Sequence, residues 1–230
     1  MNLSAAEFQA LMTSLIVSLR AVAFALPLAI GAAYFLARSK WEGKIILDAL
    51  VLAPLVLPPV VVGYLLLLIF GVRGPVGSLL NDWFGMRLAF TSAGASLAVG
   101  VMAFPLMVRA VRLSLEAMDP GLDEAAASLG AGRLDRLINV HLPLAAPGII
   151  AAAIIGFAAG LGEFGAVITF VSNVPGETQT LPLAIYGALQ EPNGDAKAAR
   201  LAVLSLTLAL IALVLAESVV RAGPASKLRR

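Results

Sequence analysis

The sequence predicts an all-α polytopic membrane protein with five transmembrane helices. The chain is 60% hydrophobic and only 13% charged, and its mean hydropathy is +0.95, which is beyond the range of soluble domains. The apolar residues also gather into five runs of about 20 residues or more, long enough to cross a hydrocarbon core of roughly 30 Å as helices. The runs cover residues 11–36, 45–70, 89–108, 148–171 and 201–220. They leave no room for a separate soluble domain, so residues 1–230 are predicted to form one domain.

The first run has to be distinguished from a secretory signal peptide. An apolar signal core spans roughly 7–15 residues and follows a basic segment. Residues 11–36 are longer, and the ten residues before them contain no Lys or Arg. We expect this run to remain in the protein as a helix.

Prolines predict a bend in the second run. Pro54, Pro58 and Pro59 remove backbone donors and disturb helical geometry. Within a membrane, such a break is tolerated where protein or a water-filled path satisfies the freed backbone groups. The run is interpreted as lining and gating a pathway, with Pro58 and Pro59 as gate candidates. A kink needed only for packing is the alternative.

The fourth run combines small residues with a carboxylate. Its glycines predict a close approach of another helix: Gly156, Gly160, Gly162 and Gly165. Glu163 lies among them, and an ionisable residue inside a membrane indicates a functional site. Because a carboxylate repels an anionic ligand, we expect Glu163 to have a structural or gating role. Gly162, Glu163 and Gly165 are therefore further candidates for the pathway.

A cationic partner for Glu163 is available in the first run. Arg20 is the only Lys or Arg inside any of the five runs. One hypothesis is that Arg20 pairs with Glu163; the alternative is that its side chain snorkels to the outer interface.

The distribution of positive charge predicts the orientation. With the N-terminus outside, the inner loops and the C-terminal tail hold eleven Lys and Arg residues, against four in the outer loops. Since Lys and Arg accumulate on the cytoplasmic side, we expect an external N-terminus and a cytoplasmic C-terminus. Trp83 and Phe84 in an outer loop are possible interfacial anchors. A short helix is expected near residues 183–189, and Glu217 and Arg221 have the spacing of an i,i+4 pair.

One cytoplasmic stretch, residues 119–143, is polar and is called the polar segment below. It reads DPGLDEAAASLGAGRLDRLINVHLP. Asp119 and Pro120 are typical of a helix start, and Gly130 is typical of a helix stop. A second helix is expected after Gly132, ending at Pro143, with one apolar face: Leu134, Leu137, Ile138 and His141. Such short helices are marginal alone, so we expect the membrane, the spans or a partner to cover them.

The spacing within the polar segment resembles a known signature. Glu124-Ala125-Ala126, Gly130, Val140 and Leu142-Pro143 are similar to the EAA signature of permease subunits in binding-protein-dependent ABC importers, which prefer Ile at the position of Val140. The resemblance implies a type I importer permease fold in which these seven residues form the coupling helix region that docks in the ATPase subunit. Glu124 would contact the ATPase or serve the helix dipole.

Two further stretches resemble a narrower family, the permease subunits of molybdate importers, which also carry tungstate. They are APLVLPPVVVGYLLLLIFGVRGPVG (53–77) and LGEFGAVITFVSNVPGETQTLP (161–182). Sulfate permeases share a related stretch in the fourth run, and no residue here separates the oxyanions physically. The resemblance implies a second copy of the chain, a cytoplasmic ATPase dimer and an external binding protein, in a bacterial cytoplasmic membrane.

Other functional classes find less support. The chain has one His, no Cys and no carboxylate pair in a plausible site, so we predict no catalytic residue, metal or cofactor. It lacks the phosphate-binding loop motif, so ATP hydrolysis is expected in a separate subunit. No nucleic-acid partner is expected. A secondary transporter also needs broken helices, but five spans are few for that class.

Overall fold

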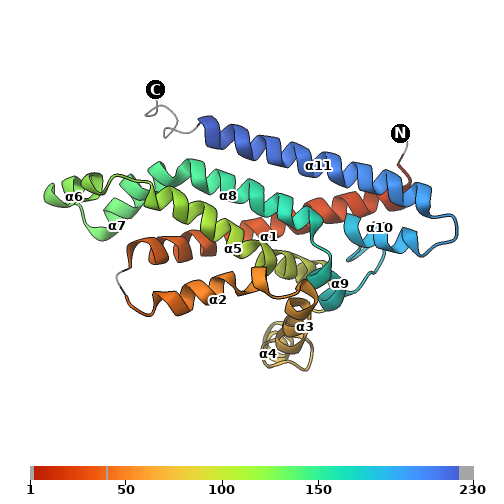
Figure 1. The fold of residues 1–230 in the computed structure, drawn as a ribbon. Helices are drawn as coiled ribbons and strands as arrows, with labels where there is room; N and C mark the ends of the chain where they lie inside the picture. Colours follow the sequence, from red (N-terminus) through yellow and green to blue (C-terminus); the bar gives the residue numbers. More distant parts are fainter. Residues whose placement is uncertain (1–2, 40, 223–230) are drawn as a thin grey trace.

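The computed structural model describes residues 3–39 and 41–222, and this part of the chain is helical throughout, without a strand (Figure 1). One of its elements, η1 (Leu137–His141), is a π-helical turn. In chain order the elements are α1 (Ala5–Arg38), α2 (Lys44–Val56), α3 (Pro59–Phe70), α4 (Pro75–Phe84), α5 (Ser92–Glu116), α6 (Pro120–Ser128), α7 (Arg133–Arg136), η1 (Leu137–His141), α8 (Leu142–Gly162), α9 (Gly165–Val171), α10 (Leu181–Leu189) and α11 (Asp195–Ala222).

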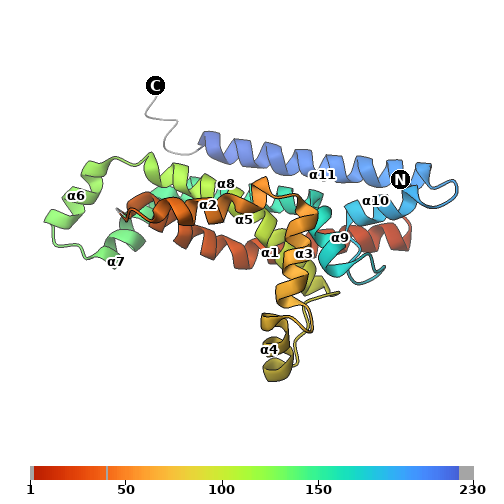
Figure 2. The ribbon, with the colours of Figure 1, turned by 60° about the horizontal axis from the view of Figure 1, so that its bottom comes forward.

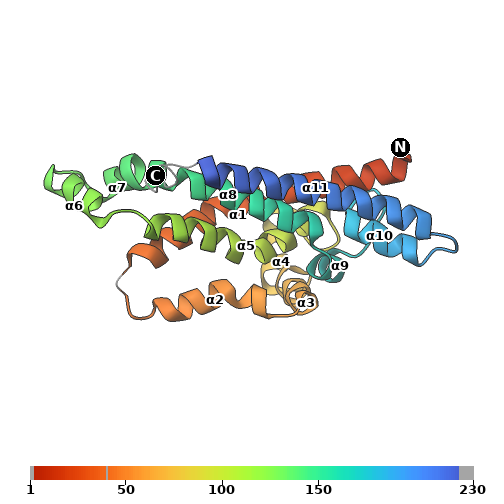
Figure 3. The ribbon, with the colours of Figure 1, turned by 45° about the horizontal axis from the view of Figure 1, so that its top comes forward.

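Four long helices, α1, α5, α8 and α11, run side by side along the molecule (Figures 1 and 3). Helix α2 lies along the same bundle, whereas α3 and α4 turn away from it (Figure 2). Helices α6 and α7 extend beyond one end of the bundle, and α10 lies at the other end. Among the described residues, four helices are long and apolar enough to span a membrane, or five if α2 and α3 form one broken span. The predicted fold class is confirmed.

Small residues let the long helices approach closely. Ala21, Ala25, Ala29 and Ala33 are buried at four-residue spacing along α1. In α8, a Cβ atom at Gly156 would lie 2.7 Å from the sulfur of Met107 in α5, and one at Gly160 would lie 2.7 Å from Val99 in α5. The core therefore depends on close backbone approach, as expected for helices packed in lipid.

The first helix begins at Ala5, earlier than the predicted run. The Ser4 hydroxyl accepts a hydrogen bond from the Glu7 N–H, and the Glu7 carboxylate accepts one from the Ser4 N–H at 2.8 Å. This capping box satisfies free donors at the helix start. Glu7 Oε1 also lies 2.8 Å from Arg200 Nη2 of α11, so one side chain fixes α1 to the last helix.

The second run is broken rather than merely kinked. Helices α2 and α3 meet at an angle of 113° across the break between Val56 and Pro59. The Leu57 N–H makes the last helical hydrogen bond of α2, to the Ala53 carbonyl, because neither Pro58 nor Pro59 has an N–H. Pro59 then occupies the first position of α3, where its missing donor costs nothing.

The fourth run differs from the prediction at both ends. Its helix ends at Gly162, and α9 starts separately at Gly165, so residues 148–171 are not one helix. At the other end, Pro143 does not terminate the preceding helix: α7, η1 and α8 form one continuous helical stretch, Arg133–Gly162. The Leu142 N–H donates to the Leu137 carbonyl across five residues, and this wider turn makes room for the proline ring next to it.

Helix α10 confirms the short helix expected near residues 183–189. The loop with Trp83 and Phe84, predicted to be an outer loop, contains α4, and both side chains are exposed. The predicted pair of Glu217 and Arg221 stays a prediction, because the side chain of Arg221 lies outside the described residues.

Candidate functional site

The first half of the polar segment is a short helix with well-formed ends. The Asp119 carboxylate accepts the Gly121 N–H at 2.8 Å and caps the start of α6. At its end, the Gly130 N–H donates to Ala127 and the Ala131 N–H donates to Ala126, both at 3.0 Å. Gly130 has a φ of +89°, which completes a Schellman motif. The predicted start and stop of this helix are confirmed.

The surface of the polar segment is open. Glu124, Ala125 and Gly130 are exposed, Ala126 is half-buried, and no described residue of α6 is buried. Four larger apolar side chains are also exposed: Leu122 by 48%, Leu129 by 88%, Leu134 by 67% and Ile138 by 52%. Nothing in the described part of the chain covers these side chains, which leaves them available for contact with another molecule.

The second half of the signature belongs to the continuous helix. Val140 and Leu142 are half-buried and Pro143 is exposed, and all three lie on the stretch that continues into α8 (Figure 1). The seven signature residues are therefore divided between α6 with its C-terminal cap and a helix that runs through the bundle.

A side chain that the sequence did not single out as a contact joins these two halves. Asp123 Oδ2 of α6 lies 2.9 Å from Arg136 Nη1 of α7, and Asp123 Oδ1 lies 2.9 Å from His141 Nε2 of η1. His141 does not share the exposed face of Leu134 and Ile138 as expected; it is 3% exposed. The π turn adds a residue to the helix and so rotates His141 inward.

The second part of the candidate site is a crossing of α3 over α9. A Cβ atom at Gly165 would lie 2.7 Å from the Cβ of Pro59. At Gly63 of α3, a Cβ atom would lie 2.6 Å from the carbonyl oxygen of Ala166. The structure thus brings together Pro59 and Gly165, two of the predicted pathway residues. Pro58 and Gly162 are exposed, and a Cβ atom at Gly162 would meet nothing within 4 Å in the described chain.

Glu163 lies at the break between α8 and α9. Its Oε1 accepts the Ala166 N–H at 2.9 Å, so it binds a free donor at the start of α9. Arg20 instead directs Nη1 at the Ser92 hydroxyl, 3.5 Å away. The hypothesis of a Glu163–Arg20 pair is wrong for this structure: within the described residues, the broken helix supplies Glu163 with a backbone partner.

The α2–α3 break leaves polar backbone groups to be satisfied. The carbonyls of Pro54 and Leu55 would normally accept from residues 58 and 59, and both of these are prolines without an N–H. Residues 55–61 are all exposed. Since free carbonyls are not tolerated in hydrocarbon, this break has to face water or another protein surface.

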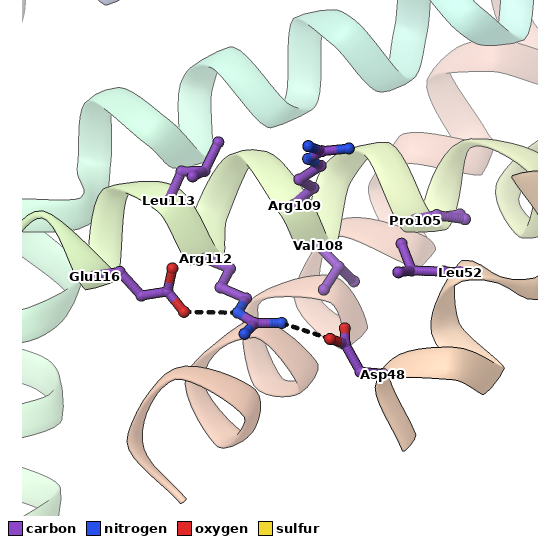
Figure 4. A pocket seen from close by; sticks show the side chains of 8 residues that line it. All are labelled: Asp48, Leu52, Pro105, Val108, Arg109, Arg112, Leu113 and Glu116. Atoms are coloured by element: carbon purple, nitrogen blue, oxygen red, sulfur yellow. Dashed lines mark hydrogen bonds and ion pairs between the residues drawn. The ribbon is translucent and has the colours of Figure 1, made fainter. Parts of the chain in front are cut away.

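A pocket of about 330 Å³ lies between α2 and α5 (Figure 4). Arg112 of α5 points to Asp48 of α2, with Nη1 3.0 Å from Oδ2, and its Nε lies 2.7 Å from Glu116. This ion pair fixes the first half of the broken span to α5. No local sequence pattern predicts this ion pair, because 64 residues separate Arg112 and Asp48.

No group of His, Cys, Asp and Glu that could hold a metal ion occurs among residues 3–39 and 41–222.

Comparison with known families decides the class of protein. Residues 25–222 match the model of the family described as the binding-protein-dependent transport system inner membrane component. The chain belongs to this family. It is therefore a permease subunit of the ABC transporter class and a multi-pass inner-membrane protein, as the four or five apolar helices require.

Individual relatives of this permease are similar over different lengths. It is 52% identical to the molybdenum transport system permease protein ModB of Escherichia coli K12, over 96% of both chains. It is 48% identical to the protein of the same name from Haemophilus influenzae, over 92% of both chains. It is 38% identical to the sulfate transport system permease protein CysT of Salmonella typhimurium, over 69% of this chain and 57% of that protein.

A solved structure of the same class shares the fold. A chain in the crystal structure of a bacterial alginate ABC transporter, in complex with an alginate pentasaccharide-bound periplasmic protein, matches with a TM-score of 0.72. The match covers 96% of this chain and 81% of that chain at 19% identity. The importer permease fold that the EAA signature implied is confirmed.

Proposed function

We propose that this permease carries molybdate, and also tungstate, across the bacterial cytoplasmic membrane. The observation that carries the proposal is the exposed polar segment with its EAA signature, in a chain that is similar to molybdenum permeases along nearly its whole length. The permease acts as a non-catalytic subunit, and ATP is hydrolysed by a separate partner.

The proposed assembly contains two copies of this chain, a cytoplasmic ATPase dimer and an external molybdate-binding protein. The N-terminus lies outside and the C-terminus in the cytoplasm, as the charge distribution favours. The polar segment then faces the ATPase, and the exposed Leu129, Leu134 and Ile138 supply apolar area for docking. Glu124 of α6 is also exposed and offers a charge to a cationic group.

The proposed pathway runs along the broken helices, between the two copies. Pro58, Pro59, Gly162, Glu163 and Gly165 belong to it, and the exposed backbone near the α2–α3 break supports this placement because a path between subunits is polar. Closure of the ATP-bound subunits brings the two polar segments together and opens the spans outward. We expect hydroxyl and backbone N–H donors to meet the oxyanion, since tight binding to fixed cations would slow its release.

Sulfate is the second candidate cargo, because sulfate permeases share part of this sequence. The lower identity and the shorter match make it the weaker candidate.

The test is uptake of labelled molybdate into proteoliposomes that contain the permease, its ATPase and its binding protein. We expect uptake to require ATP, to be inhibited by tungstate rather than sulfate, and to be lost in Gly130→Pro. Proline cannot adopt the φ of +89° at this position and removes the N–H that donates to Ala127.

Gly132→Ala is the matched control, because Gly132 has a φ of −67° that alanine adopts freely. ATP-independent uptake would contradict the proposal and favour a secondary transporter. Inhibition by sulfate alone would retain the ABC importer and change its cargo.

A further inference from the structure

The attachment of α6 to the rest of the permease is narrow. None of the described residues of α6 is buried, and the helix extends away from the bundle in Figures 1 and 2. It is nine residues long, too short to be stable in isolation. Its covalent connections pass through Ala117–Asp119 on one side and through the glycines at 130 and 132 on the other. A partner that moves α6 would therefore move the bundle only through specific side-chain contacts.

Asp123 makes those contacts. Asp123 Oδ2 accepts a hydrogen bond from Arg136 Nη1 at 2.9 Å, and Oδ1 lies 2.9 Å from His141 Nε2 without a hydrogen bond between those two atoms. The side chains of Asp123, Arg136 and His141 are 28%, 20% and 4% exposed, so the ion pair is partly shielded from water and from salt screening. The hydrogen bond from Arg136 is charge-assisted, and such bonds are stronger than those between neutral groups.

The contact continues into the bundle. The ring of His141 lies 5.5 Å from the ring of Tyr34 in α1, tilted by 44°. The π turn that places His141 there is part of the same continuous helix as α8. Asp123 therefore connects α6 at once to the helix that runs through the bundle and, through His141, to α1.

We propose that Asp123 is a positioning residue that transmits motion of α6 to α8 and α1, so that ATP hydrolysis in the partner is coupled to opening of the spans. The inference rests on the proposed function, since it needs an ATPase that moves α6. Without the Asp123 contacts, α6 still presents its part of the docking surface, but it pivots on its glycine connections and the bundle follows its motion less closely.

The test compares ATP hydrolysed with molybdate transported, in proteoliposomes of the complete transporter. Asp123→Asn keeps the shape of the side chain and removes its charge. We expect ATP hydrolysis to continue and the ATP consumed per anion to rise roughly 3- to 30-fold. Arg136→Gln should have an effect in the same direction, and Asp123→Glu should restore part of the coupling.

Two controls separate transmission from stability. Asp82→Asn makes the same chemical change on the exposed face of α4 and should leave the ratio unchanged. Thermal unfolding of the purified complex should be the same for Asp123→Asn as for the unaltered permease. A normal ratio in Asp123→Asn would overturn the inference while leaving the proposed function in place, and so would a parallel loss of hydrolysis and transport with a lower unfolding temperature. Absence of ATP-driven uptake by the unaltered permease would overturn both.

Discussion

The polar segment and the α3–α9 crossing both lie where the helices of the bundle are interrupted, and their structures are determined in opposite ways. In the polar segment, α6 ends in a Schellman motif at Gly130 and buries none of its described residues. At the crossing, Gly63 and Gly165 are needed because another backbone or side chain occupies the space where a Cβ would be. The polar segment is shaped by hydrogen bonds within a few residues, and the α3–α9 crossing by contact between segments that are distant in the sequence.

This difference suggests a division of labour between docking and gating. A segment defined by its own caps keeps its shape when its surroundings change, which suits a surface that docks on a moving partner. A crossing defined by close packing has few alternative arrangements, which suits a gate that changes between discrete states. Substitution of glycine by alanine tests both halves of the comparison with the same chemical change.

The largest effect is expected at the crossing. In Gly63→Ala, the added Cβ would lie 2.6 Å from the Ala166 carbonyl oxygen and 2.8 Å from Thr169 Cβ, so α3 and α9 must separate. Overpacking of this kind costs about 1–3 kcal/mol. We expect a lower unfolding temperature in detergent and reduced transport.

Gly31→Ala is the control for this prediction. Gly31 lies within α1, and a Cβ there would meet nothing within 4 Å. Alanine is favoured over glycine inside a helix by roughly 0.5–1 kcal/mol, so this variant should be as stable as the unaltered protein or more so. Equal destabilisation by the two substitutions would show that the crossing is not tightly packed.

A smaller and more local effect is expected in the polar segment. In Gly130→Ala, space is available but the φ of +89° is not, and a left-handed conformation costs a residue with a Cβ roughly 1–2 kcal/mol. Because the described residues of α6 bury no side chain, the unfolding temperature should hardly change. Amide hydrogen exchange should become faster in α6 alone.

Gly132→Ala serves as the comparison for exchange, since its φ of −67° imposes no strain. Faster exchange throughout the bundle in Gly130→Ala would mean that the polar segment is not an independent unit.

The sequence predicted the features that depend on neighbouring residues. Composition and run length predicted the spans, although the fourth differs at both ends. The caps predicted the ends of α6, and the three prolines of the second run predicted a bend, which is a full break in the structure. The capping box formed by Ser4 and Glu7 also has a sequence pattern, because Ser-x-x-Glu before an apolar run is typical of a helix start. This pattern, rather than the start of the apolar run, marks the start of α1.

The features that the sequence did not predict depend on tertiary structure. Pro143 is a helix breaker by its local chemistry, and only the preceding π turn lets the helix continue. The sequence predicts a continuous helix at Glu163, but the helix breaks before α9. Glu163 therefore accepts a hydrogen bond from the Ala166 N–H instead of pairing with Arg20. The contact of Asp123 with His141 crosses a bend whose angle no single-sequence pattern specifies.

The central claim is that a cytoplasmic ATPase docks on the polar segment, and site-specific labelling tests it most directly. The chain has no cysteine, so Leu129→Cys and Leu189→Cys each introduce one reactive thiol. Both leucines are well exposed, at 88% and 60%, and they lie towards opposite ends of the molecule, next to α6 and in α10 (Figures 1 and 3). We predict that adding the ATPase subunit to the permease in detergent slows maleimide labelling at position 129 and leaves position 189 unchanged. Equal labelling at position 129 with and without the ATPase, or protection at position 189, would contradict the claim.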